Sequence, residues 1–300
     1  MAALLPVVFA LLAACSDALA TVLQRRAALT VPRSEGFRPG LVLDLLRRPL
    51  WLGGILAVVA AGVCQAAALA TGPLTLVQPL FVLELPLALL FASAIGGRRL
   101  PGALLLAASL VVAGLGTALV SASPDGNRTH VALDRWLPVL ATCAAAVLVL
   151  AAAGLRRPPG PARAGCLGAA TAVCFAVTAG LMKTATHILA EDGIGAFLTA
   201  WQTYGFAVAG VCAVLLLEHA MQGGPLVASQ PALTLGDATV SFLLGVVVYE
   251  EHVRTGWWLL PELLGIGLVA AGVVALARGE GPALEEPAPG PASNAAPPVQ

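Results

Sequence analysis

Charged residues are scarce in this 300-residue chain: only 11% of its residues are charged, whereas 59% are apolar. A soluble domain carries roughly 25% charged residues, so this chain lacks the charge that would cover a water-facing surface. The composition therefore predicts a polytopic membrane protein of all-α class, with the lipid bilayer as its main partner.

An excess of positive charge is also missing. Sixteen basic and sixteen acidic residues give a net charge of zero, and Lys183 is the only lysine. Because nucleic-acid binding requires a basic patch, we expect no nucleic-acid partner. The six cysteines form no Cys-x-x-Cys pair and all lie in apolar runs, which is typical of small core residues rather than of metal or redox ligands.

Common catalytic motifs are absent as well, including His-Glu-x-x-His, Gly-x-Ser-x-Gly and the P-loop. Gly236-Asp237 matches part of the intramembrane aspartyl protease motif, but Thr234 stands where that motif needs glycine. We therefore expect no enzymatic activity and no resident cofactor. Without a motif for ATP hydrolysis, any transport is expected to be secondary or channel-like.

Apolar runs of about 20 residues, long enough to cross a bilayer, are the dominant feature of the chain. They predict nine membrane-spanning helices at residues 3–24, 50–71, 73–95, 100–120, 136–155, 165–187, 195–217, 225–248 and 256–277. The arginine-rich segment 25–49 is the longest loop between them, and the Pro/Ala-rich tail 279–300 is expected to be disordered.

Arginines are distributed unevenly between the two sides of these predicted spans. Twelve arginines fall on one side, while three arginines and Lys183 fall on the other. Positively charged loops remain in the cytoplasm. The sequence therefore predicts a plasma-membrane protein with its N-terminus outside and its C-terminus in the cytoplasm.

One short motif occurs twice. Gly72-Pro73-Leu74-x-x-x-Gln78-Pro79 begins the third predicted helix, and Gly224-Pro225-Leu226-x-x-x-Gln230-Pro231 begins the eighth, 152 residues later. Five spans, an odd number, separate the copies, so they cross the membrane in opposite directions. This pattern predicts an inverted repeat of five helices (1–155) and four helices (156–278), as in many secondary transporters.

Three segments resemble the drug/metabolite transporter superfamily, most closely its NIPA-type branch, which is linked to magnesium transport. They are Leu23-Gln24-Arg25-Arg26-Ala27-Ala28-Leu29, Arg48-Pro49-Leu50-Trp51-Leu52-Gly53-Gly54 and the first copy of the motif above. The resemblance covers residues 3–277 and implies a secondary transporter of a small solute or cation.

This chain departs from the magnesium branch in its second helix. Gly62 occupies the position of an acidic residue, and only the amide three residues later is kept, as Gln65. A NIPA-like Mg²⁺ transporter is therefore the alternative to a transporter of another solute. A membrane scaffold that transports nothing is a further alternative.

Four acidic residues lie inside predicted spans: Asp17, Glu84, Asp237 and Glu262. A charged side chain at the bilayer centre costs at least about 2.5 kcal/mol, and such residues usually mark ion or proton pathways. The repeat aligns Glu84 with Gly236, so Glu84 and Asp237 are expected at a similar depth.

We interpret these residues as a binding site for a cation, either transported Mg²⁺ or a coupling proton, with Glu84 and Asp237 as possible metal ligands. The predicted site residues are Glu84, Asp237, Gln78, Gln230, Asp17 and Gln65. The alternative is that the two acids are protonated and donate hydrogen bonds that only hold helices together.

The remaining polar residues are expected at the membrane surfaces. Lys183 is interpreted as extending its amine to the outer face, and Glu250-Glu251-His252 as a solvated helix end. Glu262 follows two interfacial tryptophans, so it is expected to lie at shallow depth.

Overall fold

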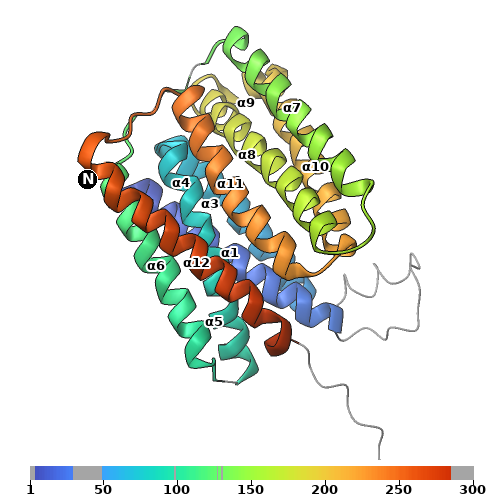
Figure 1. Ribbon diagram of the computed structural model, residues 1–300. Coiled ribbons are helices and arrows are strands. Elements are labelled where there is room, and N and C mark those ends of the chain that lie inside the picture. The colour runs from blue at the N-terminus through green and yellow to red at the C-terminus, as the bar shows by residue number, and fades with distance from the viewer. Residues whose placement is uncertain (1–3, 30–48, 98, 127, 130, 285–300) are drawn as a thin grey trace, which may run out of the picture.

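The computed structural model describes residues 4–29, 49–97, 99–126, 128–129 and 131–284. Within these residues the chain is helical, and nine helical segments are long and apolar enough to cross a membrane, which confirms the predicted polytopic all-α class (Figure 1). The elements are α1 (Leu4–Leu29), α3 (Pro49–Thr71), α4 (Leu74–Leu80), η1 (Phe81–Leu83), α5 (Glu84–Gly96), α6 (Gly102–Ala122), α7 (Leu133–Leu155), α8 (Pro161–Glu191), α9 (Gly193–Thr199), α10 (Trp201–Gly223), α11 (Leu226–Val247), η2 (Gly256–Trp258) and α12 (Leu259–Leu284).

The third span is not one continuous α-helix. It comprises α4, a 3₁₀ turn (η1) and α5. Pro79 lies inside α4, and proline removes a backbone donor and disturbs the turn before it. The resulting break ends immediately before Glu84, which is the first residue of α5.

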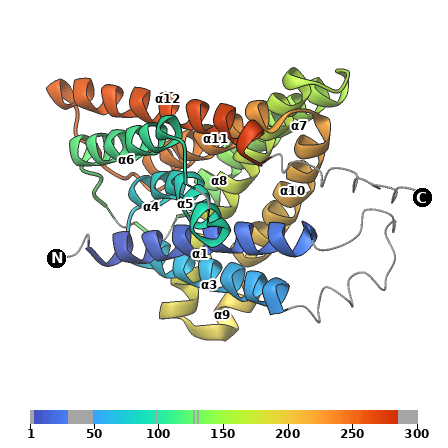
Figure 2. The same ribbon diagram turned by 90° about the horizontal axis from the view of Figure 1, so that it is seen from below.

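Helix α8 forms the axis of the bundle. Sixteen of its 31 residues are buried, because it packs against α3, α7, α10 and α11. Helices α1 and α3 lie side by side, and so do α6 and α12 (Figure 2). The site described below lies between α1, α5 and α11.

Glycines allow α6 and α12 to approach closely. A Cβ atom on Gly265 of α12 would lie 2.6 Å from the backbone oxygen of Gly114 on α6, and one on Gly272 would lie 2.8 Å from the oxygen of Ala107. Close backbone approach at small residues is a main source of helix–helix attraction in a bilayer, where apolar surface alone gives little driving force.

The predicted tail begins later than expected. Helix α12 continues to Leu284, five residues beyond Gly279, and Gly279 itself packs directly on Leu104 of α6. Residues 285–300 of the tail, and residues 30–48 of the arginine-rich loop, lie outside the described residues.

We predict that Gly265→Ala lowers the free energy of unfolding by about 1–3 kcal/mol, because the added methyl group overpacks the α6–α12 contact. Gly267→Ala is the matched control, since a Cβ there meets no atom within 4 Å. Thermal unfolding of the purified protein in detergent compares the two variants. Equal melting temperatures would contradict the importance of this contact.

Candidate functional site

Three of the intramembrane acids come together from three helices. Asp17 lies on α1, Glu84 begins α5 and Asp237 lies on α11. The carboxyl group of Glu84 interacts electrostatically with those of Asp17 and Asp237. The hydroxyl of Thr21, one turn after Asp17 on α1, donates to Glu84 Oε1 at 3.4 Å. We call these three interacting acidic groups the acid cluster (Asp17, Glu84 and Asp237).

The acid cluster lacks a compensating positive charge. In the described part of the chain, no Lys or Arg forms an ion pair with any of its three members. Asp237 Oδ1 instead accepts a hydrogen bond from Ser241 at 3.3 Å. All three acids are half-buried.

Its geometry does not form a closed metal site. Among the described residues, no three His, Cys, Asp or Glu side chains lie close enough to hold one metal ion. A hydrated cation needs fewer protein ligands, because Mg²⁺ keeps several waters and commonly uses only one or two carboxylates. The cluster is therefore suited to a proton or to a cation that keeps other ligands.

The three predicted amides do not join this cluster. Gln78 is buried on α4, while Gln65 on α3 and Gln230 on α11 are half-buried. None of the described hydrogen bonds joins these amides to the acids. Glu262, on α12, is 93% buried and belongs to a different part of the bundle, against α6.

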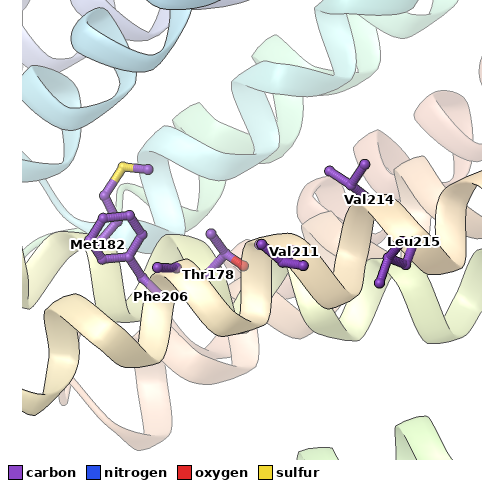
Figure 3. A pocket seen from close by; sticks show the side chains of 8 residues that line it. Thr178, Met182, Phe206, Val211, Val214 and Leu215 are labelled. Carbon is purple, nitrogen blue, oxygen red and sulfur yellow. The ribbon is translucent and has the colours of Figure 1, made fainter. Parts of the chain in front are cut away.

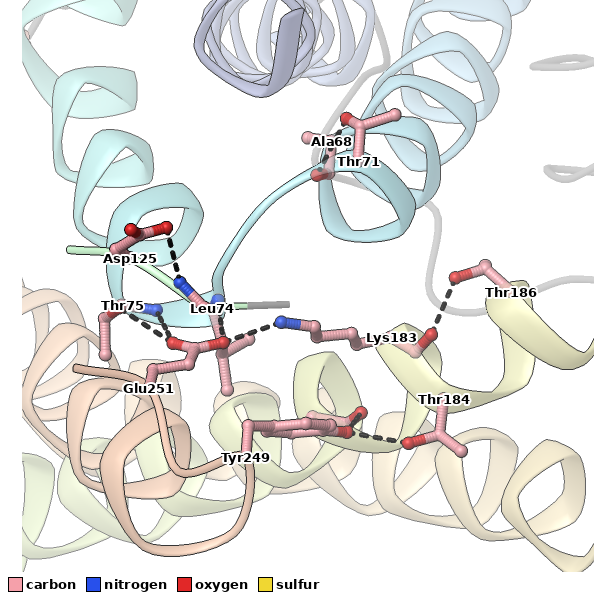
Figure 4. A network of polar contacts seen from close by, with 12 residues as sticks. Ala68, Thr71, Leu74, Thr75, Asp125, Lys183, Thr184, Thr186, Tyr249 and Glu251 are labelled. Atoms are coloured by element: carbon pink, nitrogen blue, oxygen red, sulfur yellow. Dashed lines mark hydrogen bonds and ion pairs between the residues drawn. The ribbon is translucent and has the colours of Figure 1, made fainter. Parts of the chain in front are cut away.

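A second polar centre lies at the start of α4, around Glu251 (Figure 4). Its carboxylate accepts hydrogen bonds from the backbone N–H groups of Leu74 (2.6 Å) and Thr75 (2.8 Å), and from the Thr75 hydroxyl (2.8 Å). Lys183 Nζ on α8 completes the set with an ion pair at 2.6 Å, and both charged side chains are fully buried.

The structure therefore contradicts two expectations from the sequence. Lys183 does not extend its amine to the membrane surface, and Glu251 is not a solvated helix end. The carboxylate satisfies donors that the first turn of α4 leaves without partners, and Lys183 balances its charge. Sequence reasoning missed this pair because its members are 68 residues apart.

Tyr249 supports the ion pair from the side. Its ring lies 4.7 Å from Lys183 Nζ and meets Trp136 edge to face at 6.1 Å between ring centres. The hydroxyl donates to Gly180 O at 2.5 Å and contacts the Thr184 hydroxyl at 2.8 Å. Burial raises the pKa of Tyr249, so its hydroxyl remains a donor.

Hydrogen bonds and ion pairs join the loop after α11 to the segment between α6 and α7, beside Glu251. Asp125 and His252 exchange two backbone hydrogen bonds, at 2.9 and 2.8 Å. Glu250 forms ion pairs with Arg128 and Arg135, and the hydrogen bond from Arg135 holds the pKa of Glu250 below its ordinary value. We call this end of the bundle the Glu251 end.

The opposite end carries several of the arginines. The ends of α1 and α5 meet where Arg26 lies 3.3 Å from the Cβ position of Gly96, and the end of α10 meets the start of α8 where Arg163 lies 3.2 Å from that of Gly223. Helix α7 begins at the Glu251 end and α8 follows it, so the Arg163 contact lies at the other end of the bundle. Helix α5 also ends away from the start of α4, so the Arg26 contact lies there too. We call this the Arg26 end.

An apolar groove of about 440 Å³ lies between α8 and α10. It is lined by Thr178, Met182, Phe206, Ala207, Gly210, Val211, Val214 and Leu215 (Figure 3). Thr178 is its only polar side chain, and its hydroxyl already donates to Cys174 O. The groove holds none of the acids, so the acid cluster is the better candidate for a functional site.

Sequence comparison relates the whole bundle to a bacterial protein. The chain is 30% identical over 268 residues to an uncharacterized protein of Corynebacterium glutamicum, and the match covers 88% of this chain and 90% of the other. The chain belongs to the family of this corynebacterial protein. No family model and no solved structure matches it.

We predict that Lys183→Met and Glu251→Gln each destabilise the protein, Lys183→Met by about 3–5 kcal/mol, because each change leaves a buried polar group without its partner. The double variant should lose less than the sum of the two single losses, since neither charge then remains alone. Glu250→Gln is the control, because Glu250 lies in the neighbouring exposed ion pairs. Additive losses in thermal unfolding would contradict the coupling.

Proposed function

We propose that this protein is a secondary transporter of the drug/metabolite transporter superfamily, which moves a small solute or cation across the membrane. Binding of the cation or coupling proton takes place at the acid cluster. The observation that carries the proposal is that three carboxyl groups from α1, α5 and α11 gather inside the membrane-spanning region, and that none of them has an ion-pair partner among the described residues.

The energetics favour a binding role over a packing role. Glu251, a carboxylate that joins helices, receives a lysine and three other donors. Among the described residues, Glu84 has one long hydrogen bond, from Thr21, and the charged groups that act on it are those of Asp17 and Asp237. Keeping such a cluster inside a membrane is costly, and a bound cation or proton offsets that cost.

An inverted repeat of five and four helices fits the local geometry. Pro73 and Pro225 have nearly the same backbone angles before α4 and α11, with φ −69° and −68° and ψ 145° and 141°. Gly72 packs on Pro6 near the start of α1, and Gly224 packs on Gly160 at the start of α8. The pairing of α1 with α3 also corresponds to that of α8 with α10.

Magnesium is the second candidate cargo. Two or three carboxylates that cannot surround a dehydrated ion suit a cation that retains its waters. We also propose a plasma-membrane location; for the orientation, the positive-inside rule favours the Glu251 end outside and the Arg26 end in the cytoplasm.

We predict that Glu84→Gln and Asp237→Asn abolish or uncouple transport while melting temperature stays near that of the wild type. The amides preserve shape and hydrogen bonding but hold neither a charge nor an exchangeable proton. Proteoliposomes screened with candidate solutes, Mg²⁺ first, measure the flux. Glu262→Gln is the matched control, because it removes an intramembrane carboxyl group that lies outside the cluster.

Wild-type flux and pH dependence in both cluster variants would leave the acids as packing groups. A complete lack of flux across the solute screen in the wild type would favour the scaffold alternative.

Orientation has its own test. We predict that a single cysteine at Ser123 reacts with a membrane-impermeant thiol reagent from outside intact cells, whereas one at Pro158 reacts only after the membrane is opened. Ser123 follows α6 at the Glu251 end, and Pro158 lies between α7 and α8. The reverse pattern would invert the proposed topology.

A further inference from the structure

The contacts of Glu251 join segments that the proposed repeat assigns to different halves. Leu74 and Thr75 belong to the first half, whereas Lys183 and Glu251 belong to the second. Helices of the two halves also approach closely here: a Cβ on Gly245 of α11 would lie 2.5 Å from both Thr75 Cγ2 and Glu251 Oε2. A side chain at position 245 would therefore collide with Thr75 and Glu251, so this close approach of α11 to α4 requires glycine.

Burial along the third span changes at the 3₁₀ turn. Six of the seven residues of α4, which faces the Glu251 end, are buried. Only two of the thirteen residues of α5, Pro86 and Leu89, are buried. The span is therefore tightly packed on one side of Glu84 and loosely packed on the other.

Helix α11 shows the same change. No residue from Gln230 to Val240 is fully buried, whereas Ser241, Leu244 and Gly245 are. Helix α11 packs against α4 and η1, but extensive contact between α11 and α5 is absent from the described residues. The contact between α4 and α11 is therefore packed at the Glu251 end, whereas α5 and α11 separate toward the Arg26 end, where α6 and α12 still join the two proposed halves.

The acid cluster lies at the level where this change occurs. Glu84 follows Leu74 by ten residues, or about 15 Å of helix. Between them stands the break made by Pro79 and η1, a point at which one half of a span can tilt while the other stays packed.

We propose that the Glu251 junction, made of Leu74, Thr75, Lys183, Gly245 and Glu251, is a gate that is closed in this structure, so that the acid cluster is shut off from the Glu251 end and, within the described residues, is approached from the Arg26 end. This inference rests on the proposed transport function: when access alternates, Glu251 must release the start of α4. A carboxylate with four donors makes a two-state contact, since breaking it leaves buried charges unpaired unless water enters.

Access is tested with a reporter cysteine at Thr21, whose exposed side chain touches Glu84, in protein with its six native cysteines replaced by alanine. Membrane vesicles of both orientations are treated with a charged, impermeant thiol reagent, and the single cysteines at Ser123 and Pro158 report which end faces the reagent. With an intact junction, the Thr21→Cys thiol should react from the Arg26 end and not from the Glu251 end.

Opening the gate should make the reporter thiol reactive from the Glu251 end as well. Thr75→Val and Glu251→Gln, each combined with the reporter, should raise its rate of reaction from the Glu251 end by about tenfold or more. Glu250→Gln should leave that rate within about twofold, because the described ion pairs of Glu250 are with Arg128 and Arg135 rather than with α4 or Lys183. Thr75→Val keeps the ion pair intact, so it remains informative if Glu251→Gln folds poorly.

Equal reaction from both ends in the unmodified junction would overturn the proposal, and so would an unchanged rate in Thr75→Val. These outcomes are separate from the flux assay. Loss of flux in the Glu84→Gln variant with symmetric labelling would support the transport site and refute the gate. One-sided labelling in a protein without flux would show that the Glu251 junction closes that end of the bundle, but would refute its role as a gate in transport.

Discussion

The carboxylate of Glu251 is the contact on which the arrangement of this bundle depends. A carboxylate removed from water is unfavourable unless charge and hydrogen bonds replace its hydration, and this one receives both, from Lys183 and from the first turn of α4. A helix that begins inside a membrane protein must also satisfy its first N–H groups within the protein. The Glu251 carboxylate accepts from the first N–H groups of α4 while Lys183 on α8 compensates its charge, and this set of contacts fixes where α4 begins relative to α8 and α11.

The two acidic centres differ in what surrounds them. Glu251 is fully buried and fully partnered, and its surroundings include the ring of Tyr249 and the edge of Trp136. Glu84 is half-buried and shares its surroundings with two other acids. A saturated carboxylate holds helices in place, whereas an unsaturated one has capacity left for a ligand. This difference distinguishes the structural acid from the candidate binding acids.

The sequence was sufficient to predict the number and class of spans, because hydrophobic length is a local property that each segment shows by itself. It also indicated Asp17, Glu84 and Asp237, since carboxylates in apolar runs stand out without knowledge of their neighbours. Lys183 and Glu251 could not be recognised in this way. A lysine near the end of a span and a glutamate after another have ordinary surface interpretations, and only packing across the bundle reveals that they meet. One signal was present: Lys183 is the sole lysine in a chain that otherwise uses arginine.

The break at Pro79 connects the two centres. Had α4 and α5 formed one straight helix, the packing of its first turn on Glu251 would fix the position of Glu84 as well. The 3₁₀ turn at Phe81–Leu83 separates these constraints, so α4 can stay packed against α11 while α5 does not. Pro231 leaves α11 continuous from Leu226 to Val247, and Asp237 therefore moves with the rest of its helix. Glu84 directly follows a break in its span whereas Asp237 lies within an unbroken helix, so movement of Glu84 relative to Asp237 requires a change at a single turn only.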